Sequence, residues 1–207
     1  MFSSLLLAGL VWATGASAPQ CPVSLSSVPI RPAAVRTASV RPVPVLTALT
    51  LPAADIASPA EDKVLEEEAF IALINAERSQ RGLSILTLDS MLTATARTHS
   101  EEMCSQDYFD HHSPTPGLSS PMDRYLSSLK QLGQPQPQYL LVGENIYYCS
   151  IFNDIYNVDY AHRAFMASPG HRANILEPRF AKVGIGIYRN ARGEFWVTEM
   201  FSRDRNP

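Results

Sequence analysis

The sequence predicts an α+β fold for the last two thirds of this 207-residue chain. Three helix-start motifs, in which a capping side chain precedes an apolar pattern of helical period, lie at residues 58–61, 89 and 120–123. Strand-like segments lie between and after the helices, and in one of them apolar residues alternate with glycines. Because helices must cover the apolar faces of a sheet, we expect a layered domain.

The first predicted helix begins at the Ser-Pro-Ala-Glu motif of residues 58–61. This motif supplies a capping hydroxyl, a proline at the first helical position and a glutamate three residues after the cap. Gly82 is a natural C-terminal stop. The expected core-facing side of this helix consists of Leu65, Ala69, Leu73 and Ile74.

Three further helices are predicted. Asp89 caps the second helix, whose core-facing stripe follows helical spacing and consists of Leu92, Ala96, His99 and Met103. The Ser-Pro-Met-Asp motif of residues 120–123 starts a third, shorter helix by the same capping logic. A fourth helix covers residues 158–167.

Strands are predicted at residues 139–148, 183–189 and 195–201. Asn190 and Gly193 supply turn chemistry between the last two segments, which predicts an antiparallel hairpin. Gly184 and Gly186 are only a fragment of a glycine-rich loop and lie inside a strand. They indicate close packing of a neighbouring layer rather than phosphate binding.

The N-terminal residues predict export to a secreted or periplasmic location. Residues 1–18 contain a short apolar run and end in small residues, which is typical of a secretory signal peptide. The run is too short for a transmembrane anchor, which needs about 20 apolar residues. Residues 19–60 are rich in proline and contain no aromatic residue, so we expect a disordered linker before a domain at residues 61–203.

Charge and cysteine content narrow the possibilities further. The net charge of −3 argues against nucleic acid as a partner, because such binding needs a basic footprint. In an oxidising compartment we expect a disulfide between Cys104 and Cys149, the pairing that stays inside the folded part. Cys21, in the linker, is expected to be a free or intermolecular thiol.

Histidine residues gather in one part of the chain. Four of the five lie within about sixty residues of one another, with a glutamate between them: His111, His112, His162, His171 and Glu144. Such side chains are the usual zinc ligands and general acids and bases, but no His-Glu-x-x-His helix is present and spacing alone is a weak signal. His99 and His162 fit packing or surface positions, and Ser113 lies in no nucleophile elbow.

Five sequence blocks surround these residues: LINAER at 73–78, YFDHHSP at 108–114, GENI at 143–146, FMASPGHRANIL at 165–176 and WVTEMF at 196–201. In this order, over about residues 63–203, they resemble the CAP superfamily of cysteine-rich secretory, antigen 5 and pathogenesis-related proteins, and the chain looks like a secreted bacterial member. The resemblance implies an α-β-α sandwich with a central antiparallel sheet flanked by helices. It also implies a cleft that bears two histidines and two acidic residues.

Carried over by position, the cleft of the family falls on His111, Glu144 and His171. The fourth position falls on Ser168, where many eukaryotic relatives carry glutamate, so a mechanism that needs two acids is in doubt. His112 is the alternative to His111, because the His-Ser-Pro motif can also be aligned one residue later. In such a family two facing imidazoles can hold zinc or a similar divalent ion, with Glu144 orienting or deprotonating a bound water.

Glu144 and Asn145 also allow a structural interpretation. A carboxylate at a strand end can accept backbone hydrogen bonds and hold a neighbouring loop in place. The amide of Asn145 both donates and accepts, which favours a role in fastening loops over one in ligand binding.

Three classes of function remain open. The leading hypothesis is a secreted, non-catalytic binding module with a metal-capable cleft that engages an envelope component, a lipid or a peptide. The rival is a metal-assisted hydrolase of peptide or cell-wall bonds, in which Glu144 is the base. The third is a structural envelope or adhesive element attached through the proline-rich linker.

Overall fold

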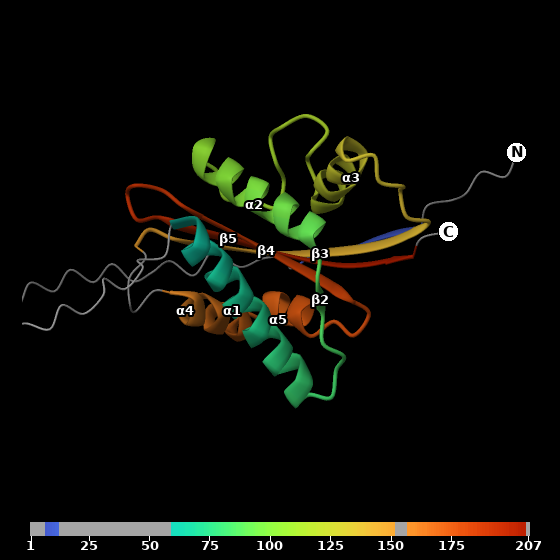
Figure 1. Ribbon diagram of the computed structural model, residues 1–207, viewed down its shortest axis with the longest axis horizontal. Coiled ribbons are helices and arrows are strands. Elements are labelled where there is room, and N and C mark those ends of the chain that lie inside the picture. The colour runs from blue at the N-terminus through green and yellow to red at the C-terminus, as the bar shows by residue number, and fades with distance from the viewer. Residues whose placement is uncertain (1–6, 13–58, 152–156, 206–207) are drawn as a thin grey trace, which may run out of the picture.

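A computed structural model describes residues 7–12, 59–151 and 157–205 of the chain. In this part a five-stranded sheet, with strand order β1-β3-β5-β4-β2, forms the middle layer. Helices α2 and α3 cover one face of the sheet, and α1, α4 and α5 cover the other (Figure 1). This arrangement confirms the predicted α-β-α sandwich.

Helices and strands are interspersed along the described parts of the chain. The helices are α1 (Pro59–Gln80), α2 (Ser90–Ser105), α3 (Pro121–Gln131), α4 (Val158–Ala167) and α5 (Pro169–Ile175). The strands are β1 (Leu7–Trp12), β2 (Thr87–Leu88), β3 (Tyr139–Cys149), β4 (Lys182–Arg189) and β5 (Phe195–Arg205). The four predicted helices and three predicted strands are all present, whereas α5, β1 and β2 were not predicted.

The sheet is antiparallel at its centre and parallel at its edges. β5 pairs antiparallel with both β3 and β4, so the predicted hairpin of the last two strands is confirmed. At the edges, β1 pairs parallel with β3, and β2 pairs parallel with β4. β1 lies inside the predicted signal peptide; residues 13–58, which include most of the predicted linker and Cys21, lie outside the described residues.

Two of the predicted helix starts are confirmed in detail. The Asp89 carboxylate accepts hydrogen bonds from the backbone N–H groups of Met91 and Leu92. Ser120 and Asp123 form a reciprocal capping box at the start of α3. These side chains satisfy N–H groups that have no partner within the helix, which explains why the helices begin at these positions.

The predicted core-facing side of α1 was correct for Ile74 but wrong for Leu65, which is 59% exposed. The buried face of α1 consists of Glu67, Phe70, Ile74 and Arg78. Glu67 accepts a hydrogen bond from the backbone N–H of Ile187 in β4, and Arg78 donates to the carbonyl of Ile175. Two charged residues can occupy core positions because distant backbone groups form hydrogen bonds with them. The pattern of apolar residues in the sequence therefore does not reveal this face of α1.

Close packing between α2 and β4 depends on glycine. A Cβ atom at Gly186 would lie 2.1 Å from backbone atoms of Ala96 and Arg97 in α2, and one at Gly184 would lie 2.2 Å from the backbone nitrogen of Thr93. Only glycine leaves room for the helix at this distance. The predicted role of these glycines in layer packing is confirmed.

The sheet separates two sides of the core. The larger cluster, under α1, α4 and α5, includes Phe70, Phe165, Ile185 and Cys149, while the side under α2 and α3 contains smaller clusters to which Cys104 belongs. Cys104 is a free thiol, so the predicted Cys104–Cys149 disulfide is wrong. The two cysteines lie on opposite sides of the sheet, and a disulfide requires Cβ atoms within about 4.5 Å.

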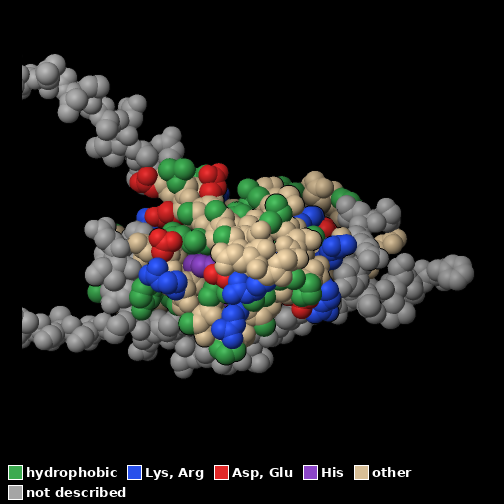
Figure 2. Space-filling model, turned by 90° about the horizontal axis from the view of Figure 1, so that it is seen from below, with side chains coloured by type: hydrophobic (Ala, Val, Ile, Leu, Met, Phe, Trp, Pro, Cys, Tyr) green, Lys and Arg blue, Asp and Glu red, His purple; other side chains and the backbone are tan. Residues whose placement is uncertain are grey.

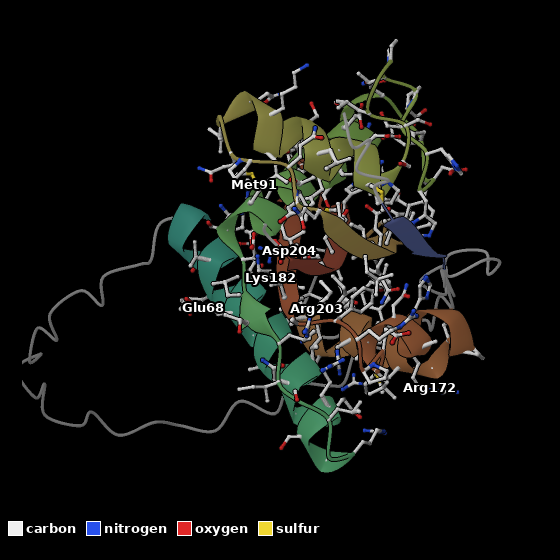
Figure 3. All side chains as sticks on the ribbon, turned by 90° about the vertical axis from the view of Figure 1, so that its right-hand side faces the viewer. Glu68, Met91, Arg172, Lys182, Arg203 and Asp204 are labelled. Carbon is white, nitrogen blue, oxygen red and sulfur yellow. The ribbon has the colours of Figure 1, made fainter. Side chains whose placement is uncertain are left out.

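Charged side chains tie the layers together at one end of the molecule. The Nζ of Lys182 in β4 lies 2.8 Å from a carboxylate oxygen of Asp204 in β5 and 3.3 Å from one of Asp89, the cap of α2. Figure 3 shows Lys182 and Asp204 together at this end, near Met91 of α2.

None of the helices in the described part of the chain has the length and apolar character needed to cross a membrane.

Candidate functional site

Residues 144 and 145 of β3 organise the candidate site because neighbouring strand residues point to opposite faces of a sheet. Glu144 points to the face under α2 and α3, where it contacts Arg124. Asn145 points to the face under α5, where it contacts the backbone of His171. Both side chains are buried, with 2% of Glu144 and 0% of Asn145 exposed.

The Glu144 carboxylate is held by two side chains. Its Oε1 lies 2.8 Å from Nδ1 of His111, and its Oε2 accepts a hydrogen bond from Nη2 of Arg124 at 2.5 Å. Burial alone would raise the pKa of this carboxyl, but the charges of Arg124 and the neighbouring histidines outweigh it and lower the pKa to about 2. Glu144 is therefore an ionised carboxylate with both oxygens engaged.

The loop that carries His111 is fastened to α3. Nη1 of Arg124 donates to the carbonyl oxygens of His111, Leu118 and Ser119. On the far side of the loop, Ser113 Oγ donates to Glu102 at 2.8 Å, so this buried serine has a structural contact. The loop thereby presents the His111 ring to Glu144.

The structure also distinguishes His111 from its neighbour His112. The His112 imidazole is exposed, and its Nδ1 lies 3.2 Å from Oδ1 of Asp110. The His111 ring, by contrast, lies 2.8 Å from Glu144. The geometry therefore favours His111 at the site.

His171 lies in α5, a helix of seven residues that Pro169 starts. Asn145 Nδ2 donates to the His171 carbonyl at 3.1 Å, and Asn174 Nδ2 donates to the Glu144 carbonyl at 3.0 Å. These two hydrogen bonds attach α5 to β3 beside Glu144. Ser168, the fourth predicted position, lies at the junction of α4 and α5, where its side chain makes no capping hydrogen bond.

The His171 imidazole is neutral at physiological pH. Burial lowers its pKa to about 4, with a smaller contribution from the charge of His111. Glu144 and Asn145 project to opposite faces of β3, which pairs with β5 on one side and with β1, as far as Glu144, on the other.

Two further residues lie at the site although the sequence interpretation did not place them there. Arg124, which the sequence interpretation did not name, holds both Glu144 and the His111 loop. His99 was expected to pack, and it is fully buried, but its Nε2 also lies 3.8 Å from Oε1 of Glu144. Burial lowers the pKa of His99, and the charge of the Glu144 carboxylate opposes this shift.

The donor atoms limit what the site can hold. Among the residues that the structure describes, no group of three or more histidine, cysteine, aspartate or glutamate side chains is arranged to hold a metal ion. Both oxygens of Glu144 are already engaged by His111 and Arg124, so the candidate metal donors are the imidazoles of His111 and His171. Two imidazoles with water in the remaining positions suit a weakly held divalent ion rather than a closed structural zinc site.

The surface beside α5 has mixed charge. Arg172, which directly follows His171, is exposed and lies on the outer side of α5 (Figure 3). On the face that α1, α4 and α5 form, acidic and basic side chains are interspersed (Figure 2). A mixed surface gives no long-range attraction to a polyanion.

A comparison with known protein families decides the classification. The model of the family described as "CAP: Cysteine-rich secretory protein family" matches residues 71–201, more than half of the chain. This chain belongs to the CAP family. The five sequence blocks noted above lie in the matched range, and the predicted resemblance is confirmed.

Relatives of this CAP protein include two uncharacterized proteins of Bacillus subtilis (strain 168). YkwD is 35% identical over 154 residues, which cover 74% of this chain and 51% of YkwD. YlbC, described as a membrane protein, is 28% identical over 123 residues, which cover 59% of this chain and 32% of YlbC. The CAP chain thus spans about half or less of these relatives.

Solved structures share the CAP fold. An extracellular protein containing an SCP domain from Bacillus anthracis str. Ames is 27% identical, with a TM-score of 0.56 and coverage of 72% of this chain and 44% of that one. An outer surface protein of Borrelia burgdorferi is 15% identical, with a TM-score of 0.57 and coverage of 68% of this chain and 94% of that one. At this lower identity the likeness concerns the fold alone.

Proposed function

We propose that this CAP domain is a secreted, non-catalytic binding module whose cleft, formed by His111 and His171, can hold a divalent metal ion. The observation that carries the proposal is the bonding and charge of the Glu144 carboxylate. This carboxylate is ionised, buried and bonded on both oxygens, to His111 and to Arg124. It is therefore built to orient His111, as carboxylates do behind metal-binding histidines.

The same geometry weighs against hydrolysis. A general base works best when its pKa lies near the working pH, and a carboxyl with a pKa of about 2 is a weak base at neutral pH. Ser168 has a hydroxyl where a second carboxylate would be needed. Metal-assisted hydrolysis of peptide or cell-wall bonds is thus the second candidate, and a structural envelope or adhesive role is the third.

Two imidazoles, those of His111 and His171, would be the protein ligands of a divalent ion such as zinc. With Nδ1 of His111 directed to Glu144, the Nε2 atom of that ring is the one that would coordinate the ion. His171 is neutral and needs no deprotonation before binding. When bound, such an ion would supply an electrophilic centre with water in its remaining coordination positions.

The proposed location and ligand follow from the class of protein. The Bacillus anthracis relative is an extracellular protein, and this chain begins with a segment typical of a secretory signal peptide. A secreted or periplasmic domain without a strong basic surface would engage an envelope component, a lipid or a peptide. The cell envelope is therefore the proposed site of action.

Isothermal calorimetry with zinc tests the metal-binding part of this proposal. We expect one site in the wild-type chain, lost in His111→Ala and in His171→Ala, and retained in the control His112→Ala, whose imidazole is exposed. A wild-type protein that gives no heat with zinc contradicts the proposed cleft. Zinc binding that His171→Ala leaves intact contradicts the assignment of the ligands.

A second experiment separates the module from the hydrolase. Purified wild-type and Glu144→Gln proteins are incubated with peptide and peptidoglycan libraries, with and without a chelator. The proposed module retains a ligand without turnover. Turnover that the chelator and Glu144→Gln both abolish would instead establish the hydrolase.

A further inference from the structure

A buried network of two amides and one carboxyl group lies behind His171, on the face of the sheet that α5 covers. Asn145 and Glu199 are direct cross-strand neighbours on β3 and β5. One carboxyl oxygen of Glu199 accepts a hydrogen bond from Asn145 Nδ2 at 2.8 Å. The exposed fraction of Asn145, Asn174 and Glu199 is 0% in each case.

The Asn145 amide is held in one orientation by three contacts. Its nitrogen donates to Glu199 and to the His171 carbonyl, and its oxygen accepts a hydrogen bond from Asn174 Nδ2 at 2.9 Å. Rotation of the amide by half a turn would place its oxygen against the acceptors and its nitrogen against a donor. The acceptor on Glu199 therefore helps to decide which way the amide points, and the amide holds the backbone of His171.

Burial favours the neutral form of the Glu199 carboxyl group, while its oxygen accepts the hydrogen bond from Asn145. Burial raises its pKa to about 8, and the hydrogen bond from Asn145 opposes this rise only in part. Charged or titratable groups on the helices that pack on this face include His171 of α5, His162 of α4 and Arg78 of α1, and none of them shifts the pKa of Glu199. The second carboxyl oxygen is buried and has no hydrogen-bond partner within the described part of the chain.

We propose that Glu199 is a positioning residue for the cleft: its carboxyl group orients the Asn145 amide, which in turn holds the backbone of His171 and thus places the imidazole opposite His111. The consequence for metal affinity rests on the proposed function, whereas the positioning of His171 does not. A glutamine at residue 199 has the same shape and the same acceptor, and it preserves the network. An apolar residue there leaves one N–H of Asn145 without an acceptor in the core.

The test compares Glu199→Gln and Glu199→Leu with the control Thr198→Val. Thr198 adjoins Glu199 on β5 but faces α2, where its hydroxyl lies 2.8 Å from that of Ser100, so the control removes a buried hydrogen bond on the other side of the sheet. Nuclear magnetic resonance in the absence of metal follows the amide and imidazole signals of His171 and the side-chain amide of Asn145 between pH 6 and pH 9. Calorimetry then gives the zinc affinity of each protein.

We expect the wild-type signals to shift together with a midpoint near pH 8, and Glu199→Gln to keep the neutral-pH positions without this transition. Glu199→Leu should displace the His171 signals and weaken zinc binding by about tenfold or more, while Thr198→Val does neither. The proposal is overturned if Glu199→Leu keeps wild-type His171 signals and a zinc affinity within about twofold of wild type.

Two other outcomes are also informative. If Glu199→Leu does not fold, the comparison of wild type with Glu199→Gln decides, and His171 signals of Glu199→Gln that are displaced from the wild-type positions at neutral pH overturn the proposal. If the wild-type protein binds no zinc, the proposed function fails. The resonance comparison still tests the positioning role in that case.

Discussion

Arg124 and Glu144 form a buried ion pair in which Nη2 of the guanidinium lies 2.5 Å from Oε2 of the carboxylate. The pair joins α3 to β3, and the same arginine holds the loop that carries His111. A buried pair of this kind contributes little when both partners are present, but removal of one partner leaves an unpaired charge in the core.

We expect substitutions of Arg124 and Glu144 to be strongly coupled in their effects on the free energy of unfolding. Arg124→Met should lower the free energy of unfolding by about 3–5 kcal/mol, because it leaves the Glu144 charge buried with only histidine contacts. The double variant Arg124→Met/Glu144→Gln should recover at least about 1 kcal/mol of that loss, which urea denaturation can measure. Strictly additive effects of the two substitutions would contradict the assignment.

If Glu199 is neutral in the folded protein, Glu199→Gln should increase the stability of the fold by an amount that depends on pH. The carboxyl keeps its proton in the folded protein up to about pH 8 but releases it near pH 4.5 in the unfolded chain. The folded state thus binds more protons between these values, and wild-type stability falls as the pH rises through this interval. Glu199→Gln lacks this loss, so its advantage in thermal denaturation should grow from pH 4.5 to pH 8 and then level off.

The exposed glutamate Glu101 provides a matched control for this prediction. Glu101→Gln removes a carboxyl on α2 that lies at the surface. Its stability should follow the wild-type pH dependence throughout. An advantage of Glu199→Gln that is the same at pH 5 and at pH 8 would count against a protonated Glu199.

We expect the substitution His162→Leu to stabilise the fold. Its ring is buried, and neither ring nitrogen has a hydrogen-bond partner in the described part of the protein. His162→Leu should raise the free energy of unfolding by about 1–2 kcal/mol, because it removes polar atoms that lost their hydration without compensation. Burial lowers the pKa of His162, so the unfolded chain takes up its proton first, and the gain should grow as the pH falls below about 6.5.

Replacement of the exposed His112 by leucine is the comparison for His162→Leu. It should change the free energy of unfolding by less than about 0.5 kcal/mol. If His162→Leu were destabilising at neutral pH, the histidine would have to have a partner that the described residues do not provide.

We expect that no side chain larger than that of glycine fits at residue 186, where α2 contacts the sheet. In Gly186→Ala the new methyl group would lie 2.1 Å from backbone atoms of Ala96 and Arg97, so the helix must move. We expect a loss of about 3 kcal/mol or more in chemical denaturation. Gly133→Ala is the control: φ is +64° there and no atom lies within 4 Å, so strain alone should cost about 1 kcal/mol.

The fold was predictable where local chemistry and packing agree. The stripe of α2 was correct at all four positions, Leu92, Ala96, His99 and Met103, because a helix that lies flat on a sheet buries one side at helical spacing. The stripe of α1 was not, since Glu67 and Arg78 take core positions through bonds to distant backbone groups that no local pattern reveals.

The candidate site was predictable only in part. His111, Glu144, Asn145 and His171 lie in the sequence blocks of the family, whereas Arg124 has no local signal and acts through a fold that brings α3 over β3. Glu199 lies in a family block, but its protonation depends on complete burial in the folded chain. The failed disulfide has the same origin, because sequence order does not tell on which side of the sheet Cys104 and Cys149 lie.

The central claim is that His111 and His171 form a two-histidine metal site that Glu144 orients without joining it. Crystals of the zinc-soaked wild-type protein, with anomalous scattering recorded at the zinc edge, test this claim most directly. We predict one anomalous peak at about 2.0–2.1 Å from a ring nitrogen of each histidine, with the Glu144 carboxylate still on Arg124. No peak at saturating zinc, or a zinc ion bound directly to the Glu144 carboxylate, would contradict it.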